Sequence, residues 1–275
     1  MPTLHTIVLE PWLWLGGSVL VAMLWTNLAW LFSPWAESER STAEPVSLPE
    51  RTVHHLANWR FAPGLFQALR LLYHVGLPAA AFFWGRDAVV SRFLGLQSLV
   101  LPTQAGTGVS IDANWSAWAH DLGWAGALAL GAGALLILSS ITYRRAVPDS
   151  ERTARSSEAL GWRSAREALY HEVHWAFYRN APIVAFGLYW GTWAGLAVAA
   201  LEAVINPTWR RQVSDPDHTW HALSQGAMAV LSSMLFLHTQ NLWLGLLLHW
   251  GISWVIRTYA PPPTLSNPAE SPHRA

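Results

Sequence analysis

The strongest constraint on the fold is a series of long apolar runs. A helix needs about 20 mostly apolar residues to span the hydrocarbon core of a bilayer, and several runs of this chain approach that length. They cover residues 11–32, 64–84, 118–142, 182–206, 220–238 and 241–259. Only 12% of the residues are charged, against about 25% in ordinary soluble domains. We therefore expect an all-α, polytopic membrane bundle with about six transmembrane helices.

Small residues recur four apart in two of these runs, a spacing that lets helix backbones approach closely in lipid. The pairs are Ala127 with Gly131, Ala129 with Gly133, Ala222 with Gly226, and Ala229 with Ser233. This favours a packed bundle over isolated anchors. We divide the chain into N-terminal transmembrane helices over 1–145, a helical core over 146–260 and a disordered tail over 261–275, which is rich in proline and polar residues.

The distribution of arginine predicts an orientation. Short loops rich in basic residues stay on the cytoplasmic side of a membrane, and segment 143–181 holds Arg144, Arg145, Arg152, Arg155, Arg163, Arg166 and Arg179. We therefore place this segment in the cytoplasm, at the cytoplasmic membrane of a bacterium. Alternation of the six runs then puts 33–63 inside and both termini outside. Arg210 and Arg211 conflict with this scheme, because it places them outside.

Composition also excludes several kinds of function. The chain has no cysteine, so disulfides, thiolate metal sites and a cysteine nucleophile are excluded. Its formal net charge is zero, which gives no electrostatic footprint for nucleic acid. The partners that we expect are membrane lipid and a membrane-associated peptide or protein.

The segment REALYHEVHWAFYR, 166–179, has the pattern of a helix with two polar stripes. One stripe carries Glu167, His171, His174 and Tyr178, and the other carries Glu172 and Arg179. Two interpretations are open. The stripes face a cavity between helices, as ionisable groups in membranes usually do, or an amphipathic helix near 162–180 lies at the interface with its charges in water.

Polar residues also interrupt the other apolar runs. Glu202 and Asn206 are one turn apart near the end of run 182–206, and His249 lies in the middle of run 241–259. Arg70 and His74 lie one turn apart in run 64–84. We expect these two to partner acidic side chains elsewhere, because unpaired charges in a membrane are costly.

The C-terminal half resembles the CPBP intramembrane endopeptidases, the CAAX-protease and bacteriocin-processing family. The stretch LFLHTQNLWLGLLLHWGISW, 235–254, is similar to the last motif of that family, with His249 at the motif histidine and Ser253 four residues later. The first family motif, EExxxR, has its spacing in HWAFYR. Arg179 stands at the arginine, and His174 and Trp175 stand where the family has glutamates.

The second family motif, FxxxH, falls on residues 202–206, where Glu202 and Asn206 stand instead. The resemblance covers about residues 162–259 and implies an all-α membrane bundle that hydrolyses a peptide bond with glutamate-activated water and histidines. Relative to the family, the histidine and the glutamate of the first two motifs are exchanged. We expect Glu202 to be the base, and His174 and His249 to polarise the water and the carbonyl.

Asn206 and Ser253 would be hydrogen-bonding partners of this set. Glu172 is a rival base, because it lies two residues before the position of the first motif.

Two other functions fit the same residues. The missing glutamates of the first motif fit an inactive scaffold, immunity factor or assembly factor. A metal-dependent membrane enzyme would use a divalent metal held by His171, His174 and Glu167, together with Glu202 and His249. HEVH is one residue too short for the HExxH zinc motif, and no other cofactor is expected.

Overall fold

The computed structural model describes residues 4–31, 59–84, 111–146 and 157–258, and this part of the chain is all-helical, without strands. The all-α class is confirmed. The elements in chain order are α1 (Leu4–Leu31), α4 (Ala62–Leu71), the π-helical turn η1 (Leu72–Gly76), α5 (Leu77–Trp84), α7 (Ile111–Ala146), α8 (Ser157–Ile205), α9 (Pro207–Ser214), α10 (Pro216–Thr239) and α11 (Leu242–Thr258). The predicted tail, 261–275, and most of segment 33–63 lie outside the described residues.

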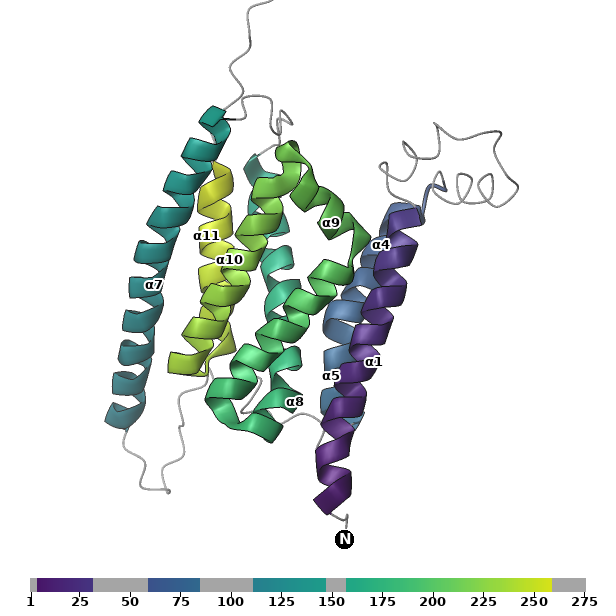
Figure 1. Cartoon of the computed structure of the whole chain (residues 1–275). Helices are drawn as coiled ribbons and strands as arrows, with labels where there is room; N and C mark the ends of the chain where they lie inside the picture. The colour runs from purple at the N-terminus through teal and green to yellow at the C-terminus, as the bar shows by residue number, and fades with distance from the viewer. Residues whose placement is uncertain (1–3, 32–58, 85–110, 147–156, 259–275) are drawn as a thin grey trace, which may run out of the picture.

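Helix α8 folds back on itself at Gly187, so it is a hairpin of two antiparallel arms, 157–186 and 188–205 (Figure 1). Gly187 has φ 75° and ψ 174°, a conformation that glycine adopts far more readily than other residues. A Cβ atom on Gly191 would lie 2.3 Å from the Cα of Ile183, and one on Gly195 would lie 2.7 Å from the Cα of Arg179. The two arms are therefore in backbone contact.

This hairpin corrects the expected boundary at residue 182. Pro182 is buried inside the first arm and does not begin a new helix. The chain reverses five residues later, because Gly187 can adopt the left-handed φ that the turn requires and proline cannot. The segment near 162–180 is consequently one arm of the packed bundle, and its side chains from Tyr170 to Pro182 are mostly buried.

Because the elements of the bundle run alternately up and down, two ends can be defined (Figure 1). The start of α8, helix α9 and the last residues of α7 and α11 lie at the upper end in that view, which we call the arginine end. Trp250 Nε1, from α11, donates to the carbonyl of Gly161, near the start of α8, at 3.2 Å. At the opposite end, the rings of Trp124 and His238 stack with centroids 4.0 Å apart.

The expected alternation is wrong in two respects. It placed Arg210 and Arg211 opposite the arginine-rich segment, whereas α9 carries both at the same end. It also placed both termini together, whereas α1 begins at the end opposite to the one where α11 finishes. The reason is that α8 runs through the bundle twice, once with each arm, whereas the alternation counted this segment once.

Helix α8 forms the centre of the bundle. One apolar cluster joins it to α1 and α5 through Leu15, Ala81, Phe177, Tyr178 and Ala181. A second cluster joins α10 to α11, with residues of α7 packed against it, through Met228, Leu235, Leu244, Leu248 and Ile252. Helix α7 therefore lies on the far side of α10 and α11 from α1, as Figure 1 shows.

Two segments are long and apolar enough to cross a membrane, Trp118–Tyr143 and Gly161–Ile205. In the first, only 11% of the most apolar window is buried inside the protein. Large apolar surfaces that face outward are typical of contact with a membrane or another protein, so these helices favour membrane association.

The stretch NLW, 241–243, has a local structural role. The Oδ1 atom of Asn241 accepts from the backbone N–H of Trp243 at 3.0 Å and of Leu244 at 3.4 Å, which caps the start of α11. The preceding Gln240 has φ 47°, which lets the chain reverse between α10 and α11. This short turn sets the register that brings His249 opposite α8.

We predict that Gly191→Ala lowers stability by about 1–3 kcal/mol, because the added methyl group meets the backbone of the other arm. The matched control is Gly126→Ala in α7, where nothing lies within 4 Å of the added Cβ and alanine is the better helix former. Thermal or denaturant unfolding of the purified protein measures both. Equal stability of the two variants would contradict the close contact.

Candidate functional site

Two histidine–glutamate pairs lie inside the bundle, and the α8 hairpin contributes to both. The Nε2 atom of His174 lies 2.9 Å from Oε2 of Glu202, across the two arms. The Nδ1 atom of His249 on α11 lies 3.1 Å from Oε1 of Glu172 on the first arm. We call the first the hairpin pair and the second the inner pair.

The hairpin pair has two tyrosine neighbours. The hydroxyl of Tyr73, on η1, lies 2.9 Å from Nε2 of His174 and donates to Oε1 of Glu202 at 3.0 Å. The hydroxyl of Tyr178 lies 3.2 Å from that of Tyr73. The side chain of His174 is 5% exposed and that of Glu202 is 16% exposed, so the carboxylate is the more accessible member.

The inner pair is completely enclosed, with 1% exposure of both side chains. The Ser232 hydroxyl on α10 donates to Oε2 of Glu172 at 2.6 Å and accepts from Arg179 at 3.4 Å. The guanidinium of Arg179 also lies 4.3 Å from the centre of the Phe236 ring, a cation–π contact. This network joins the first arm of α8 to both C-terminal helices.

Two further histidines lie between the pairs. The ring of His171 stacks on that of His249 with centroids 5.7 Å apart, and it lies 6.3 Å from the ring of His74. The ring of His74 in turn lies 5.2 Å from that of His174. These are ring contacts and not hydrogen bonds. The Nδ1 atom of His74 is 2.9 Å from the carbonyl of Arg70.

The structure thus brings together some of the predicted residues and separates others. His174 and Glu202 meet, as the proposed exchange of motif residues requires. His249 partners Glu172 and not Glu202. Arg70 pairs with Glu167 through both guanidinium nitrogens, which places it beside an acid as expected, whereas His74 contacts a backbone carbonyl and aromatic rings.

Asn206 and Ser253 are not hydrogen-bonded to either pair. The Oδ1 atom of Asn206 accepts from the backbone N–H of Thr208 at 2.9 Å and of Trp209 at 3.4 Å, which caps α9. A cap satisfies backbone donors that no helical carbonyl can reach. Ser253 is half-buried, and within the described ranges no hydrogen bond joins it to Glu172 or Glu202.

The candidate metal ligands do not converge. Across the described helices, no group of three or more His, Asp or Glu side chains is placed to hold a metal ion. Glu167 is engaged by Arg70, and His171 stacks against Trp175 with centroids 5.2 Å apart. The residues His171, His174 and Glu167 share a helix, but each faces a different partner.

Sequence reasoning missed Tyr73 and Ser232. The available signal for Tyr73 was its place beside Arg70 and His74, as the third polar side chain in an apolar run. Ser232 was not singled out because it lies among the small residues of α10, where a serine usually serves close packing between helices. Neither belongs to a motif, and both are recognised only through their partners on α8.

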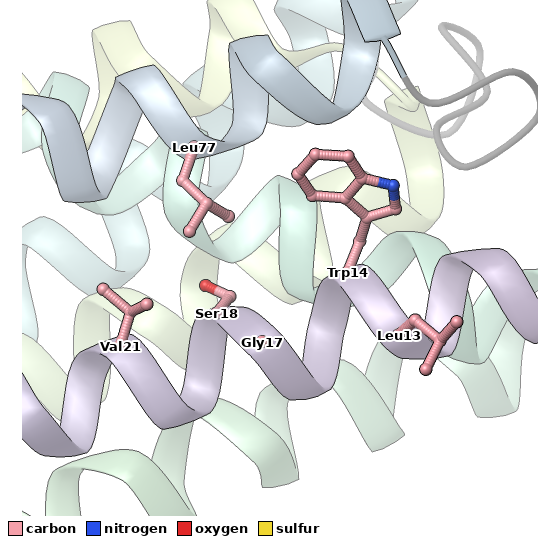
Figure 2. A pocket seen from close by; sticks show the side chains of 6 residues that line it. All are labelled: Leu13, Trp14, Gly17, Ser18, Val21 and Leu77. Atoms are coloured by element: carbon pink, nitrogen blue, oxygen red, sulfur yellow. The ribbon is translucent and has the colours of Figure 1, made fainter.

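An open groove of about 300 Å³ lies along α1, near the hairpin pair. Figure 2 shows its lining, which is apolar apart from Ser18 and consists of Leu13, Trp14, Gly17, Ser18, Val21 and Leu77. Trp14 and Leu77 also pack against the cluster that contains Tyr178. Tyr178 therefore belongs to the cluster that borders the groove, and its hydroxyl lies 3.2 Å from that of Tyr73.

Comparisons with protein families, curated proteins and solved structures found no match to this chain. The function is therefore inferred from the side-chain geometry together with the sequence pattern.

We predict that Asn206→Ala lowers stability by about 1 kcal/mol, because two N–H groups at the start of α9 lose their acceptor. Asn206→Asp keeps a capping oxygen and should retain wild-type stability. Unfolding measurements on both variants test this assignment. If Asn206→Asp were as unstable as Asn206→Ala, the side chain would have another role.

Proposed function

We propose that this chain is a membrane-embedded endopeptidase, a divergent relative of the CPBP type, and that the hairpin pair activates the attacking water. The observation that carries the proposal is the contact between His174 and Glu202 at 2.9 Å, on the two segments that resemble the first two family motifs. The family would have glutamate on the first of these segments and histidine on the second. In this chain the contact would be kept, with histidine on the first arm of α8 and glutamate on the second.

Glu202 is assigned as the base. Its carboxylate would take a proton from water while the water oxygen bonds to the carbonyl carbon of the peptide, whose π electrons move to the carbonyl oxygen. The same proton would then pass to the leaving nitrogen as the C–N bond breaks. Glu202 suits this role because its side chain is 16% exposed, more than that of Glu172, the glutamate of the inner pair. Its two oxygens are held by Tyr73 and His174.

Glu172 and His249 are assigned to holding the helices together. Both are 1% exposed, and the Ser232 hydroxyl occupies the second oxygen of Glu172. A Cβ atom on Gly245 would lie 3.0 Å from that oxygen, so α11 closes over the carboxylate. A substrate has no room beside this pair without movement of a helix.

The inner pair also favours the second candidate function, a non-catalytic scaffold. Removing one member of a buried ion pair is strongly destabilising, so such a network can be kept for structure alone. The scaffold interpretation requires that the hairpin pair is structural as well. The two functions therefore differ in whether Glu202 is needed for hydrolysis.

We also propose that the protein crosses the bacterial cytoplasmic membrane seven times, with the arginine end in the cytoplasm. The passes would be α1, α4 to α5, α7, both arms of α8, α10 and α11. The second arm, 188–205, is about 27 Å long, close to the thickness of the hydrocarbon core. Basic residues favour the cytoplasmic side, and the helix ends at the arginine end carry Arg60, Arg145, Arg163, Arg210 and Arg211 among the described residues.

We predict that Glu202→Gln lowers peptide hydrolysis by about 10²–10⁴-fold, because the amide cannot accept the proton from water. Glu172→Gln should retain activity in the folded fraction and reduce stability. The assay uses purified protein in lipid nanodiscs with a library of internally quenched peptides, and His120→Gln is a control at an exposed histidine. Full activity of Glu202→Gln, or no hydrolysis by the wild type, would leave the scaffold function.

The absence of cysteine makes the topology directly testable. We predict that Arg145→Cys and Arg211→Cys are labelled by a membrane-impermeant maleimide only from the cytoplasmic side, because both exposed positions lie at the arginine end. Ala185→Cys, exposed beside the Gly187 turn, should be labelled only from the other side. Labelling of Arg211→Cys and Ala185→Cys from the same side would exclude two passes by α8.

A further inference from the structure

Tyr73 lies outside the segment that resembles the peptidase family, yet its hydroxyl is at the centre of the hairpin pair. It is within 3.2 Å of three polar atoms, one each from His174, Tyr178 and Glu202. Its side chain is only 4% exposed. The N-terminal half of the chain therefore contributes a polar group directly to the proposed active site.

The backbone at this position is also unusual. Residues Leu72–Gly76 form a π-helical turn between α4 and α5, and such single turns are frequently found at functional sites. The wider turn lets two successive residues face α8: Tyr73 contacts the hairpin pair, and His74 stacks on Tyr170 with ring centroids 5.5 Å apart. In a regular helix, successive side chains point about 100° apart.

The hydrogen-bond capacity of Tyr73 determines where the protons lie. Its single O–H proton is donated to Glu202, so it meets His174 as an acceptor, and Nε2 must carry a hydrogen. The Tyr178 hydroxyl is a partner of both the Tyr73 hydroxyl and the Glu202 carboxylate. The same Nε2 faces Oε2 of the Glu202 carboxylate at 2.9 Å, an acceptor that also requires a hydrogen on this nitrogen.

The other nitrogen of the His174 ring agrees with this assignment. Its Nδ1 atom is buried and has no partner within the described residues. A buried N–H donor without an acceptor is costly, so we assign the hydrogen of the ring to Nε2 and none to Nδ1. Glu202 then accepts from Tyr73 on Oε1 and from His174 on Oε2, and the Tyr178 hydroxyl is a further hydrogen-bond partner of the carboxylate.

We propose that Tyr73 is a positioning residue, which fixes the Nε2–H tautomer of His174 and holds the Glu202 carboxylate in the orientation that accepts a proton from water. This inference rests on the proposed function only for its catalytic consequence. The tautomer and the three contacts are properties of the folded protein and can be measured without a substrate.

The experiment is NMR of protein with ¹⁵N-labelled histidine in lipid nanodiscs. The resonance of His174 is identified by its loss in His174→Gln, or through cross-peaks with labelled tyrosine if that variant does not fold. In the wild type we expect a protonated Nε2 and a bare Nδ1. Tyr73→Phe keeps the ring and removes the hydroxyl that holds Oε1 of Glu202. The carboxylate can then turn away from His174, so that Nε2–H loses both of its acceptors, and we expect signals of both tautomers.

The matched control is Arg70→Gln. It breaks the contact of Arg70 with Glu167, which joins α4 to α8 only one turn from Tyr73, and it leaves the three hydrogen bonds of Tyr73 intact. If a general loosening of α4 caused the change, Arg70→Gln would reproduce the mixed tautomers and would overturn the proposal. A wild-type Nδ1–H tautomer, or an unchanged tautomer in Tyr73→Phe, would overturn it too.

Activity provides the second measurement. With a cleaved peptide from the library, Tyr73→Phe should lower kcat about tenfold, the effect of losing one hydrogen bond to a charged group, with KM unchanged. A rise in KM alone would assign Tyr73 to substrate binding and overturn its positioning role. Mixed tautomers in Tyr73→Phe, in a protein that hydrolyses no peptide, would support the positioning role and count against the endopeptidase.

Discussion

The reversal of α8 at Gly187 is the constraint on which the rest of the structure depends. His174 and Glu202 are 28 residues apart in sequence, and on a straight helix they would be about 42 Å apart. The positive φ of Gly187 turns the chain, and Gly191 and Gly195 let the two arms come into backbone contact. The hairpin then presents polar side chains to helices on both sides.

The polar interior follows from the cost of burying ionisable groups in an apolar bundle. Without water, a carboxylate must find donors within the protein, and each buried glutamate here is paired in that way. Glu172 is paired on both oxygens and closed off by α11, whereas Glu202 is paired and still partly exposed. This difference in accessibility, and not a difference in residue type, separates the proposed structural pair from the proposed reactive pair.

This arrangement gives a physical reason why histidine and glutamate can stand in exchanged positions relative to the peptidase motifs that the sequence resembles. A glutamate and a histidine that face each other across two helices can exchange places and still form the same contact. His174 and Glu202 fit that description, and Arg179 keeps a buried place beside the inner pair. The helices before the resembling segment also take part, since Tyr73 reaches the hairpin pair and Arg70 joins α4 to α8.

The sequence by itself determined the all-helical class and the places of most apolar helices, because run length and composition depend only on local residues. It placed the boundary at residue 182, whereas the chain reverses at Gly187. It also identified His174, Glu202, Glu172 and His249 as candidates, because charged and imidazole groups are conspicuous in apolar runs. It could not determine the α8 hairpin, since a glycine inside an apolar run is compatible with a continuous helix. Only the tertiary structure decided which histidine meets which glutamate and that Tyr73 and Ser232 join them, because those contacts depend on the register between helices that are distant in the chain.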